Sequence, residues 1–329
     1  MQSTDERSNT CDDKWSATVI GGDVRALLPC IRSVDAAMTG HSATITVILI
    51  GAEDNVREAL ASAVPADIIA PLRICSIRLE CAANAWNQFV HMLRPRATIY
   101  FFVDGGVLVQ PGAFAELAKA LCRSPAASAA AAVPSQDQGA AMLDGGHRTK
   151  PRGLLDCMPY ALRGEFVERL AARGLRLPIG LQHSGRLIGS FVLHDLDAVG
   201  SPCMPSRLVV LKGATWTMQQ TSPLRWSRLR QAWNRRVAQV LCRLEDAAIG
   251  EIVSIAGFEG LPKFANQLLL DWIARHAPRG RSLFGFLVRR RLRRRQTADP
   301  KILDARCSDW RGGSCGAPPP SNPSGAVSV

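Results

Sequence analysis

Two hydrophobic patterns alternate over the first 133 residues of the chain. Apolar runs predict strands at residues 17–20, 44–50, 72–79, 98–103 and 126–133. The run at 44–50 (TITVILI) is unbroken and rich in β-branched residues, which is typical of a strand buried on both faces of a sheet. Between these runs, apolar residues recur every three to four positions, which predicts amphipathic helices at residues 24–34, 54–63, 85–93 and 114–121. Strand–helix alternation with short links is typical of an α/β fold in which helices flank a mostly parallel, doubly wound sheet.

The rest of the chain has weaker patterns. They predict a loop at residues 135–155, a strand at 155–163 and a helix at 165–173 that ends at Gly174. Apolar segments follow at 187–196 and 206–212, and helical structure is predicted at 227–276. Residues 296–329 are rich in Pro, Gly and Ser and are predicted to form a disordered tail. No stretch reaches the 18 consecutive apolar residues of a membrane-spanning helix. The polar first 14 residues lack the apolar core of a secretory signal.

Gly and Asp residues follow three of the predicted strands, as Gly21-Gly22-Asp23, Glu53-Asp54 and Asp104-Gly105-Gly106. The carboxyl ends of parallel strands share one edge of a sheet, where ligands bind. The sequence therefore predicts one concave polar site at that edge. A nicotinamide site would need G-x-G-x-x-G after the first strand, and Gly21-Gly22 is followed by Asp-Val-Arg without a third glycine.

Each of these acidic residues also has a purely structural interpretation. Asp23 and Asp54 both stand where a helix N-cap is expected. Asp104 could end its strand as a turn residue, with Gly105 and Gly106 supplying positive φ. The sequence leaves these alternatives open.

Three ordered segments carry a resemblance to a known family. The first runs from Ala82-Ala83-Asn84-Ala85-Trp86-Asn87 through residues 99–103 to Asp104-Gly105-Gly106-Val107 and Gln110-Pro111-Gly112-Ala113. The second is residues 157–163 (CMPYALR) with Leu177-Pro178, and the third is residues 213–216 (GATW) leading to 222–226 (SPLRW). In this order and spacing, residues 16–235 resemble a divergent, bacterial-type member of the family 2 glycosyltransferases, which have the Rossmann-like GT-A fold.

The resemblance implies a hexosyltransferase-like enzyme that uses a nucleotide-sugar donor. It implies a donor site lined by Asp23, Asp54, Asn87, Asp104, Gly105 and Gly106, with Asp104 holding a divalent cation, Mg²⁺ or Mn²⁺, against the leaving diphosphate. Hard cations prefer carboxylate and phosphate oxygens. The family usually has an acid where this chain has Gly106, which leaves one carboxylate in the motif. The alternative for Asn87 is an ordinary surface position on a helix.

An inverting transfer also needs a general base for the acceptor hydroxyl. The family keeps a Glu-Asp pair after its Leu-Pro segment, but residues 180–186 (GLQHSGR) contain no acid. His183 is the first candidate for the base, and its alternative is a solvated loop histidine without a catalytic role. Asp156 is the second candidate, and Asp144 and His147 are weaker ones. The incomplete motifs leave a second hypothesis open, a catalytically degenerate relative that binds nucleotide-sugars or acts as a scaffold.

The charge of the chain is concentrated near its C-terminus. The 329 residues carry a net charge of +12, and residues 225–295 hold fifteen Arg and one Lys against five acids. The Arg279–Arg295 run encloses the apolar residues 283–288 and fits either an anionic membrane surface or a solvated basic segment. No helix-turn-helix, zinc-finger or RNP motif accompanies it, so a nucleic-acid partner is not expected.

These features divide the chain into four parts. They are a polar segment (1–15), a glycosyltransferase-like domain (16–225), a helical Arg-rich module (226–295) and a disordered tail (296–329). We expect the protein to be cytoplasmic, with peripheral attachment at the inner membrane, and to act on a glycan or lipid-linked acceptor.

The cysteines support the expectation of a reducing compartment. None of the ten forms a CxxC motif, and the nearest pairs, Cys75/Cys81 and Cys307/Cys315, lack the spacing of zinc ligands. We expect most of them to be small buried apolar residues.

Overall fold

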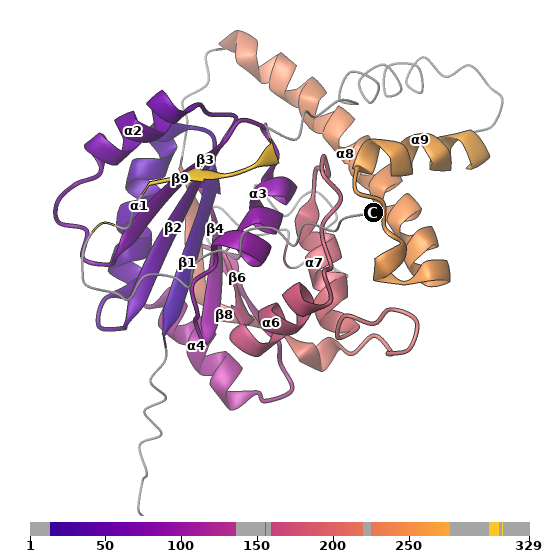
Figure 1. Cartoon of the computed structure of the whole chain (residues 1–329), viewed down its shortest axis with the longest axis horizontal. Helices are drawn as coiled ribbons and strands as arrows, with labels where there is room; N and C mark the ends of the chain where they lie inside the picture. The colour runs from indigo at the N-terminus through magenta and orange to yellow at the C-terminus, as the bar shows by residue number, and fades with distance from the viewer. Residues whose placement is uncertain are drawn as a thin grey trace, which may run out of the picture.

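The computed structural model describes residues 14–135, 155, 159–219, 225–276, 303–308 and 311. Within these residues, nine strands form one sheet in the order β5-β8-β6-β7-β4-β1-β2-β3-β9, with helices on both faces (Figure 1). Six of the nine strands run in one direction. This arrangement confirms the predicted α/β fold with a mostly parallel sheet.

The four central strands are parallel and determine the position of the site. They are β1 (Trp15–Gly21), β2 (Ala43–Ile50), β3 (Leu72–Ile77) and β4 (Ile99–Asp104). The register places Ile20 beside Asp104 in β4, and Gly21 beside Leu49 in β2. The carboxyl ends of these strands therefore lie at one edge of the sheet.

The outer strands mix both directions. Beyond β4 lie β7 (Tyr160–Arg163), β6 (Ala129–Pro134), β8 (Leu208–Met218) and β5 (Val107–Val109), of which β7 and β5 run antiparallel to their neighbours. At the other end of the sheet, β9 (Arg306–Cys307) pairs antiparallel with β3.

Alternating side chains of the strands pack against two layers of helices. One layer consists of α1 (Val24–Met38), α2 (Asp54–Ala63) and α4 (Ala113–Arg123). The other consists of α3 (Ala82–Gln88), which continues as a π-helical turn (Phe89–Leu93), α6 (Gly164–Ala172) and α7 (Ser184–Leu193). In β4, Phe101 and Val103 pack with the first layer and Tyr100 and Phe102 with the second, the period-two alternation of a strand buried on both faces.

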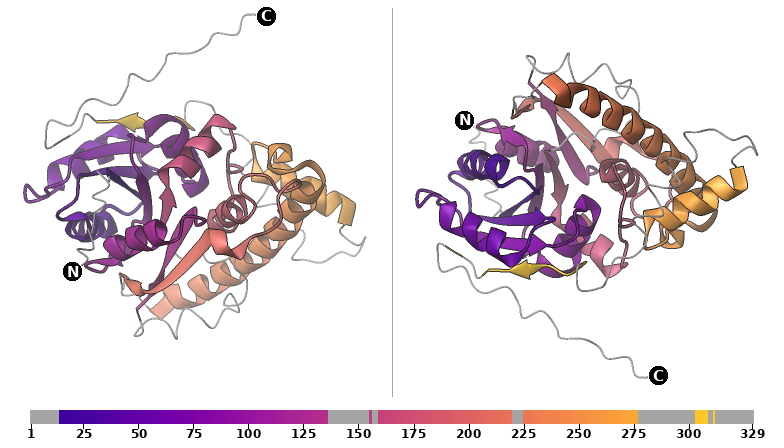
Figure 2. Two further views of the ribbon diagram at one scale, coloured as in Figure 1. Left: turned by 90° about the horizontal axis from the view of Figure 1, so that it is seen from below. Right: turned by 90° about the horizontal axis from the view of Figure 1, so that it is seen from above.

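Of the helices whose residues the structure describes, α8 (Arg225–Ala256) and α9 (Ala265–His276) lie at the opposite end of the molecule from β9 (Figure 2). They share a small apolar cluster that includes Leu241, Leu268 and Ile273. None of the described helices combines the length and the hydropathy that spanning a membrane requires.

Three predictions about secondary structure need correction. The strand predicted at residues 155–163 covers Tyr160–Arg163 among the described residues. The helical segment 227–276 is interrupted at Gly257, whose φ of 69° ends α8. The tail predicted to be disordered contains β9, because Arg306, Cys307, Ser308 and Arg311 pair with the edge strand β3, whose backbone groups provide partners.

Gly164→Ala tests the contact between α6 and the start of β4. A Cβ at this position would lie 2.4 Å from the carbonyl oxygen of Ala97 and 3.0 Å from that of Thr98. Both atoms belong to the backbone, so the substitution should lower the free energy of unfolding by ~3 kcal/mol in a urea titration followed by circular dichroism. Gly250→Ala in α8 is the matched control, since its Cβ would meet no described atom within 4 Å. It should gain ~0.5–1 kcal/mol from helix propensity, and equal losses in both variants would contradict the explanation.

Candidate functional site

The ends of β1 and β4 meet at a junction that only glycine fits. The backbone N–H of Gly105 donates to the carbonyl oxygen of Ile20 over 2.9 Å. A Cβ on Gly21 would lie 3.1 Å from the Cα of Gly105, and a Cβ on Gly105 would lie 2.8 Å from the side chain of Leu27. Gly105 and Gly106 are not among the glycines with positive φ, so the interpretation that they supply positive φ is wrong. At Gly21 and Gly105 the requirement is close approach of two backbones.

Asp104 is the exposed carboxylate at this junction. Its Oδ1 accepts a hydrogen bond of 2.9 Å from the N–H of Gly106, which fixes the orientation of the carboxylate. Among the described residues, no group of three His, Cys, Asp or Glu side chains could hold a metal ion. A divalent cation at Asp104 would therefore take its other ligands from phosphate oxygens and water, an arrangement that Mg²⁺ commonly adopts.

Asp23 follows β1 and caps α1. Its Oδ1 accepts a hydrogen bond of 3.0 Å from the backbone N–H of Arg25, as an N-cap residue does. The side chain is exposed at the same sheet edge as Asp104. The structural interpretation of Asp23 is thus confirmed, and its role toward a donor stays a prediction.

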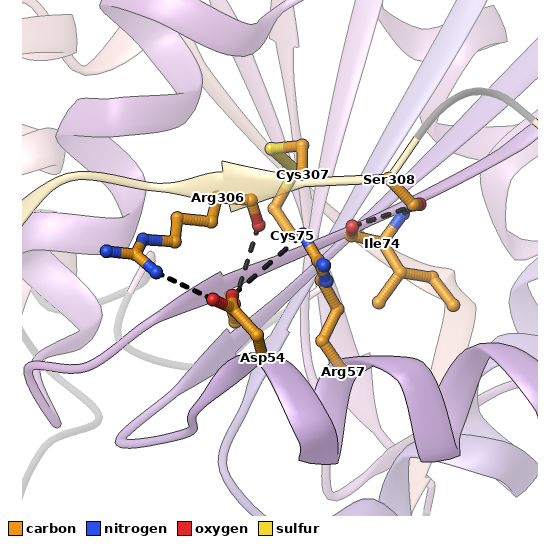
Figure 3. The surroundings of a disulfide bond; sticks show 8 residues. Asp54, Arg57, Ile74, Cys75, Arg306, Cys307 and Ser308 are labelled. Atoms are coloured by element: carbon orange, nitrogen blue, oxygen red, sulfur yellow. Dashed lines mark hydrogen bonds and ion pairs between the residues drawn. A yellow bond between two sulfur atoms is a disulfide. The ribbon is translucent and has the colours of Figure 1, made fainter.

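Asp54 lies one strand farther along the edge and binds a residue from the far end of the chain (Figure 3). It is the first residue of α2 and follows the N-cap, Glu53, so the interpretation of Asp54 as an N-cap is wrong. Its Oδ2 accepts from Nη1 of Arg306 over 2.7 Å, and its Oδ1 accepts from the hydroxyl of Ser76 over 3.2 Å. The hydrogen bond from Arg306 is the main cause that holds the pKa of Asp54 below its usual value.

Asn87 is buried rather than at the surface. Its amide donates to the carbonyl oxygen of Leu177 over 2.8 Å and accepts from the N–H of the same residue over 2.9 Å. One helical turn later, Nε2 of His91 lies 2.9 Å from the carbonyl oxygen of Leu175. These side chains fix the segment that leads to His183, and a role of Asn87 toward a diphosphate stays a prediction.

His183 is exposed at the N-cap of α7. Three residues earlier, the N–H of Gly180 donates to Sγ of Cys81, which precedes α3, so this loop lies near the carboxyl ends of the strands. Asp156, Asp144 and His147, the other candidate bases, lie outside the described residues.

The structure adds an acidic pair that the sequence did not indicate at this loop. Glu245 of α8 is 3% exposed, and both of its carboxylate oxygens lie 3.2 Å from the backbone N–H of Gln182. The next residue, Asp246, forms an ion pair with Arg186 of α7. No local pattern relates these residues to residues 180–186, because about 60 positions separate them in the chain.

The structure thus places some of the predicted site residues together at one sheet edge and leaves others apart from them. Asp104, Gly105 and Gly106 stand at the end of β4, and Asp23 stands just beyond the neighbouring β1. Asp54 shares the edge but is paired with Arg306. Arg306 and Ser76 were missed, because only tertiary pairing of β9 with β3 brings them to this edge.

No family model matches, and no curated protein matches. Among solved structures, the mannosyltransferase PcManGT from Pyrobaculum calidifontis, in complex with GDP-Man and Mn²⁺, is 15% identical with a TM-score of 0.49, and the match covers 83% of this chain and 78% of that one. TarS from S. aureus, in complex with UDP-GlcNAc, is 10% identical with a TM-score of 0.46, with 80% and 72% covered. Glucosyl-3-phosphoglycerate synthase from Mycobacterium tuberculosis is 13% identical with a TM-score of 0.45, with 76% and 81% covered. At these identities and TM-scores, the likenesses carry no conclusion about what this chain binds.

The lowered pKa of His91 predicts that the free energy of unfolding depends on pH. Burial, with a further contribution from Arg176, lowers its pKa from 6.5 to about 4, so the neutral ring bonds to Leu175 in the fold. Between these two values the unfolded chain binds more protons than the folded one. The contribution of His91 is therefore complete above pH 6.5 and is lost as the pH falls toward 4.

The test compares wild type with His91→Gln, whose amide can donate to Leu175 without titrating. After allowance for partial exposure, we expect wild type to lose ~2 kcal/mol more than the variant between pH 7 and pH 4 in urea titrations. Parallel pH profiles of the two proteins would contradict the assignment.

Proposed function

We propose that the chain binds a nucleotide-sugar at the carboxyl edge of its sheet and transfers the sugar, with inversion, to an acceptor hydroxyl. The observation that carries this proposal is the exposed carboxylate of Asp104 at the end of a central parallel strand, beside the glycine junction of β1 and β4. The resemblance of the segments around it to family 2 glycosyltransferases supplies the reaction class.

The chemistry of the donor explains why an acid belongs there. A nucleoside diphosphate leaves with two negatively charged phosphates, and an acidic edge would repel it unless a divalent cation lies between them. A cation bound by Asp104 would neutralise the charge that develops on the leaving diphosphate. With one motif carboxylate, this site would bind the cation together with the nucleotide rather than before it.

The three other polar residues of the proposed donor site have different tasks. Asp23 follows β1, the neighbour of β4, and its exposed carboxylate can accept a hydrogen bond from the nucleoside. Asp54 is the candidate acceptor for a base or ribose group once Arg306 is displaced. Asn87 would act by holding Leu177, and with it the loop on the acceptor side.

His183 is the proposed general base. It would remove the proton of the acceptor hydroxyl while the sugar–phosphate bond breaks on the opposite face. Bonds to Leu175, Leu177 and Gly180 determine the path of its loop, and Glu245 binds the N–H of the preceding Gln182. Asp156 stays the second candidate for the base.

The proposal also includes the acceptor of the sugar and the location of the protein in the cell. A glycan or lipid-linked acceptor at the cytoplasmic face of a membrane would suit the Arg279–Arg295 run, whose positive charge favours anionic headgroups. That run lies outside the described residues.

Two observations favour a second candidate function, a binding protein without catalysis. Gly106 stands where the family has an acid, and Asp54 is already paired with Arg306. A relative that kept the nucleotide site and lost transfer would tolerate both features.

Nucleotide binding is the first test. In calorimetric titrations with UDP, GDP and TDP, done in the presence of the phosphine TCEP, we expect one of the three nucleotides to bind only when Mg²⁺ or Mn²⁺ is also present. Asp104→Asn keeps the hydrogen bond from Gly106 but removes the charge, so it should weaken metal-dependent binding at least about 10-fold. Asp67→Asn, in the exposed loop before β3 at the opposite sheet edge, should bind as wild type does. Failure of all three nucleotides to bind would overturn the proposed function.

Turnover distinguishes the two candidate functions. His183→Asn should slow release of nucleoside diphosphate from the donor sugar, with water as the acceptor, by about 10²-fold or more while nucleotide affinity stays unchanged. His41→Asn, whose ring stacks on Trp15 at the other edge of the sheet, is the control. Wild-type turnover in His183→Asn would remove His183 as the base, and no turnover in wild type would favour the binding protein.

A further inference from the structure

Residues 303–308 and 311 are here called the strap, and its residues from Arg306 onward lie along the outer edge of β3. Their β-strand, β9, pairs Cys307 with Cys75 and Arg306 with Ser76. The N–H of Ser308 donates to the carbonyl oxygen of Ile74 over 2.8 Å, and its hydroxyl accepts from the N–H of Ile74 over 3.2 Å. The strap thus covers a strand edge that would otherwise present unpaired backbone groups.

The strap is also attached to the second helix layer. Leu303 is 7% exposed and belongs to the apolar core on that face of the sheet. Its carbonyl oxygen accepts from the amide of Asn84 over 2.8 Å and from that of Gln88 over 3.2 Å. Both donors come from α3, so the strap bridges the sheet edge and this helix.

A disulfide between Cys75 and Cys307 closes the strap covalently, across 232 positions of sequence (Figure 3). This pair corrects the expectation of reduced cysteines for two of the ten. Two other described cysteines, Cys122 and Cys203, are exposed free thiols. Exposed thiols are typical of chains kept in reducing compartments, where a disulfide forms and breaks in response to conditions.

The same strap occupies Asp54. Arg306, adjacent to Cys307, holds one carboxylate oxygen of Asp54 at 2.7 Å, while Ser76 holds the other. A nucleoside group that donates to Asp54 would have to displace this arginine. Because the disulfide fixes the neighbouring residue, Arg306 cannot leave with the strap while the disulfide is intact.

We propose that the strap is a redox-controlled gate on the nucleotide site: closed by the Cys75–Cys307 disulfide it holds Arg306 on Asp54, and opened by reduction it releases Asp54 for the nucleoside. This inference rests on the role of Asp54 in the proposed function. The reductant is a thiol or dithiol. No other part of the strap is held covalently to β3.

The opening step is a thiol–disulfide exchange. Cys75 is fully buried and Cys307 is partly exposed, so an incoming thiolate attacks Sγ of Cys307. A new sulfur–sulfur bond forms to Cys307, the bond to Cys75 breaks, and Cys75 leaves with the electron pair and takes a proton. A second thiolate of the reductant then attacks the reductant's sulfur in the mixed disulfide: a sulfur–sulfur bond forms within the oxidised reductant, the bond to Cys307 breaks, and Cys307 leaves with the electron pair and takes a proton. The products are two protein thiols and one oxidised reductant, a balance of two electrons and two protons.

The test compares the oxidised chain with the chain reduced by TCEP, with the state of Cys75 and Cys307 checked by mass spectrometry. The nucleotide that binds in the calorimetric test should bind about 10-fold more tightly to the reduced form. Reduction should also speed hydrogen exchange at the N–H groups of Leu72 and Ile74, which the strap protects through Arg311 and Ser308.

Variants separate the disulfide from the arginine. Cys307→Ser should bind nucleotide as the reduced wild type does, with or without TCEP. Arg306→Ala keeps the disulfide but frees Asp54, so its oxidised form should also bind tightly. Cys203→Ser, which removes an exposed thiol elsewhere, should keep the redox dependence of wild type.

The outcomes of this experiment separate the two proposals. Absence of nucleotide binding in both redox states overturns the proposed function. Equal affinity in both states, or tighter binding by the oxidised form, overturns the gate and leaves nucleotide binding standing. Unchanged hydrogen exchange at Leu72 and Ile74 after full reduction also overturns the gate, because the strap would then stay in place without its disulfide.

Discussion

The register of β1 between β2 and β4 is the constraint on which the rest of the structure depends. It places Ile20 opposite Asp104 and Gly21 opposite Leu49, so three strands end in one row. The absence of side chains at Gly21 and Gly105 lets the strands approach closely, since a Cβ on either would lie within 3.1 Å of a neighbouring atom. A shift by one residue would turn every apolar side chain of β1 to the other helix layer and move Asp104 away from the junction. Core packing and site geometry therefore follow from one alignment.

Elements with a strong local pattern were predictable from the sequence. Residues 44–50 and 98–103 are buried on both faces and show the unbroken apolar runs expected of such strands. The antiparallel insertion of β7 beside β4 and the pairing of β9 with β3 have no such signal, because they depend on tertiary contacts. A two-residue strand in a segment rich in Pro, Gly and Ser follows no period of its own, and nothing in a spacing of 232 residues indicates the Cys75–Cys307 pair.

The candidate site also contains some residues whose position the sequence predicts and others whose contacts it does not. Asp23 and Asp104 directly follow predicted strands, so their position at the carboxyl edge could be inferred from the chain alone. The partners of Asp54 and Asn87 could not be inferred from the sequence, because Arg306 and Leu177 come from segments 252 and 90 positions away. The acid that binds the loop before α7 is a similar case, since Glu245 belongs to a helix that looked from its sequence like part of a separate module. Local pattern locates a carboxylate, whereas remote contacts determine whether it is available to a ligand.

Helix α3 connects the two segments that surround the proposed site. Asn84 and Gln88, four residues apart, bind the carbonyl oxygen of Leu303 in the strap. Asn87 and His91, also four residues apart, bind Leu177 and Leu175 in the loop that leads to His183. Side chains four residues apart share one face of a helix, so one face of α3 holds the strap and another holds the loop. Because Trp86 and Phe89 anchor the helix in the core, one well-packed helix positions both the start of the strap at Leu303 and the loop at Leu175 and Leu177.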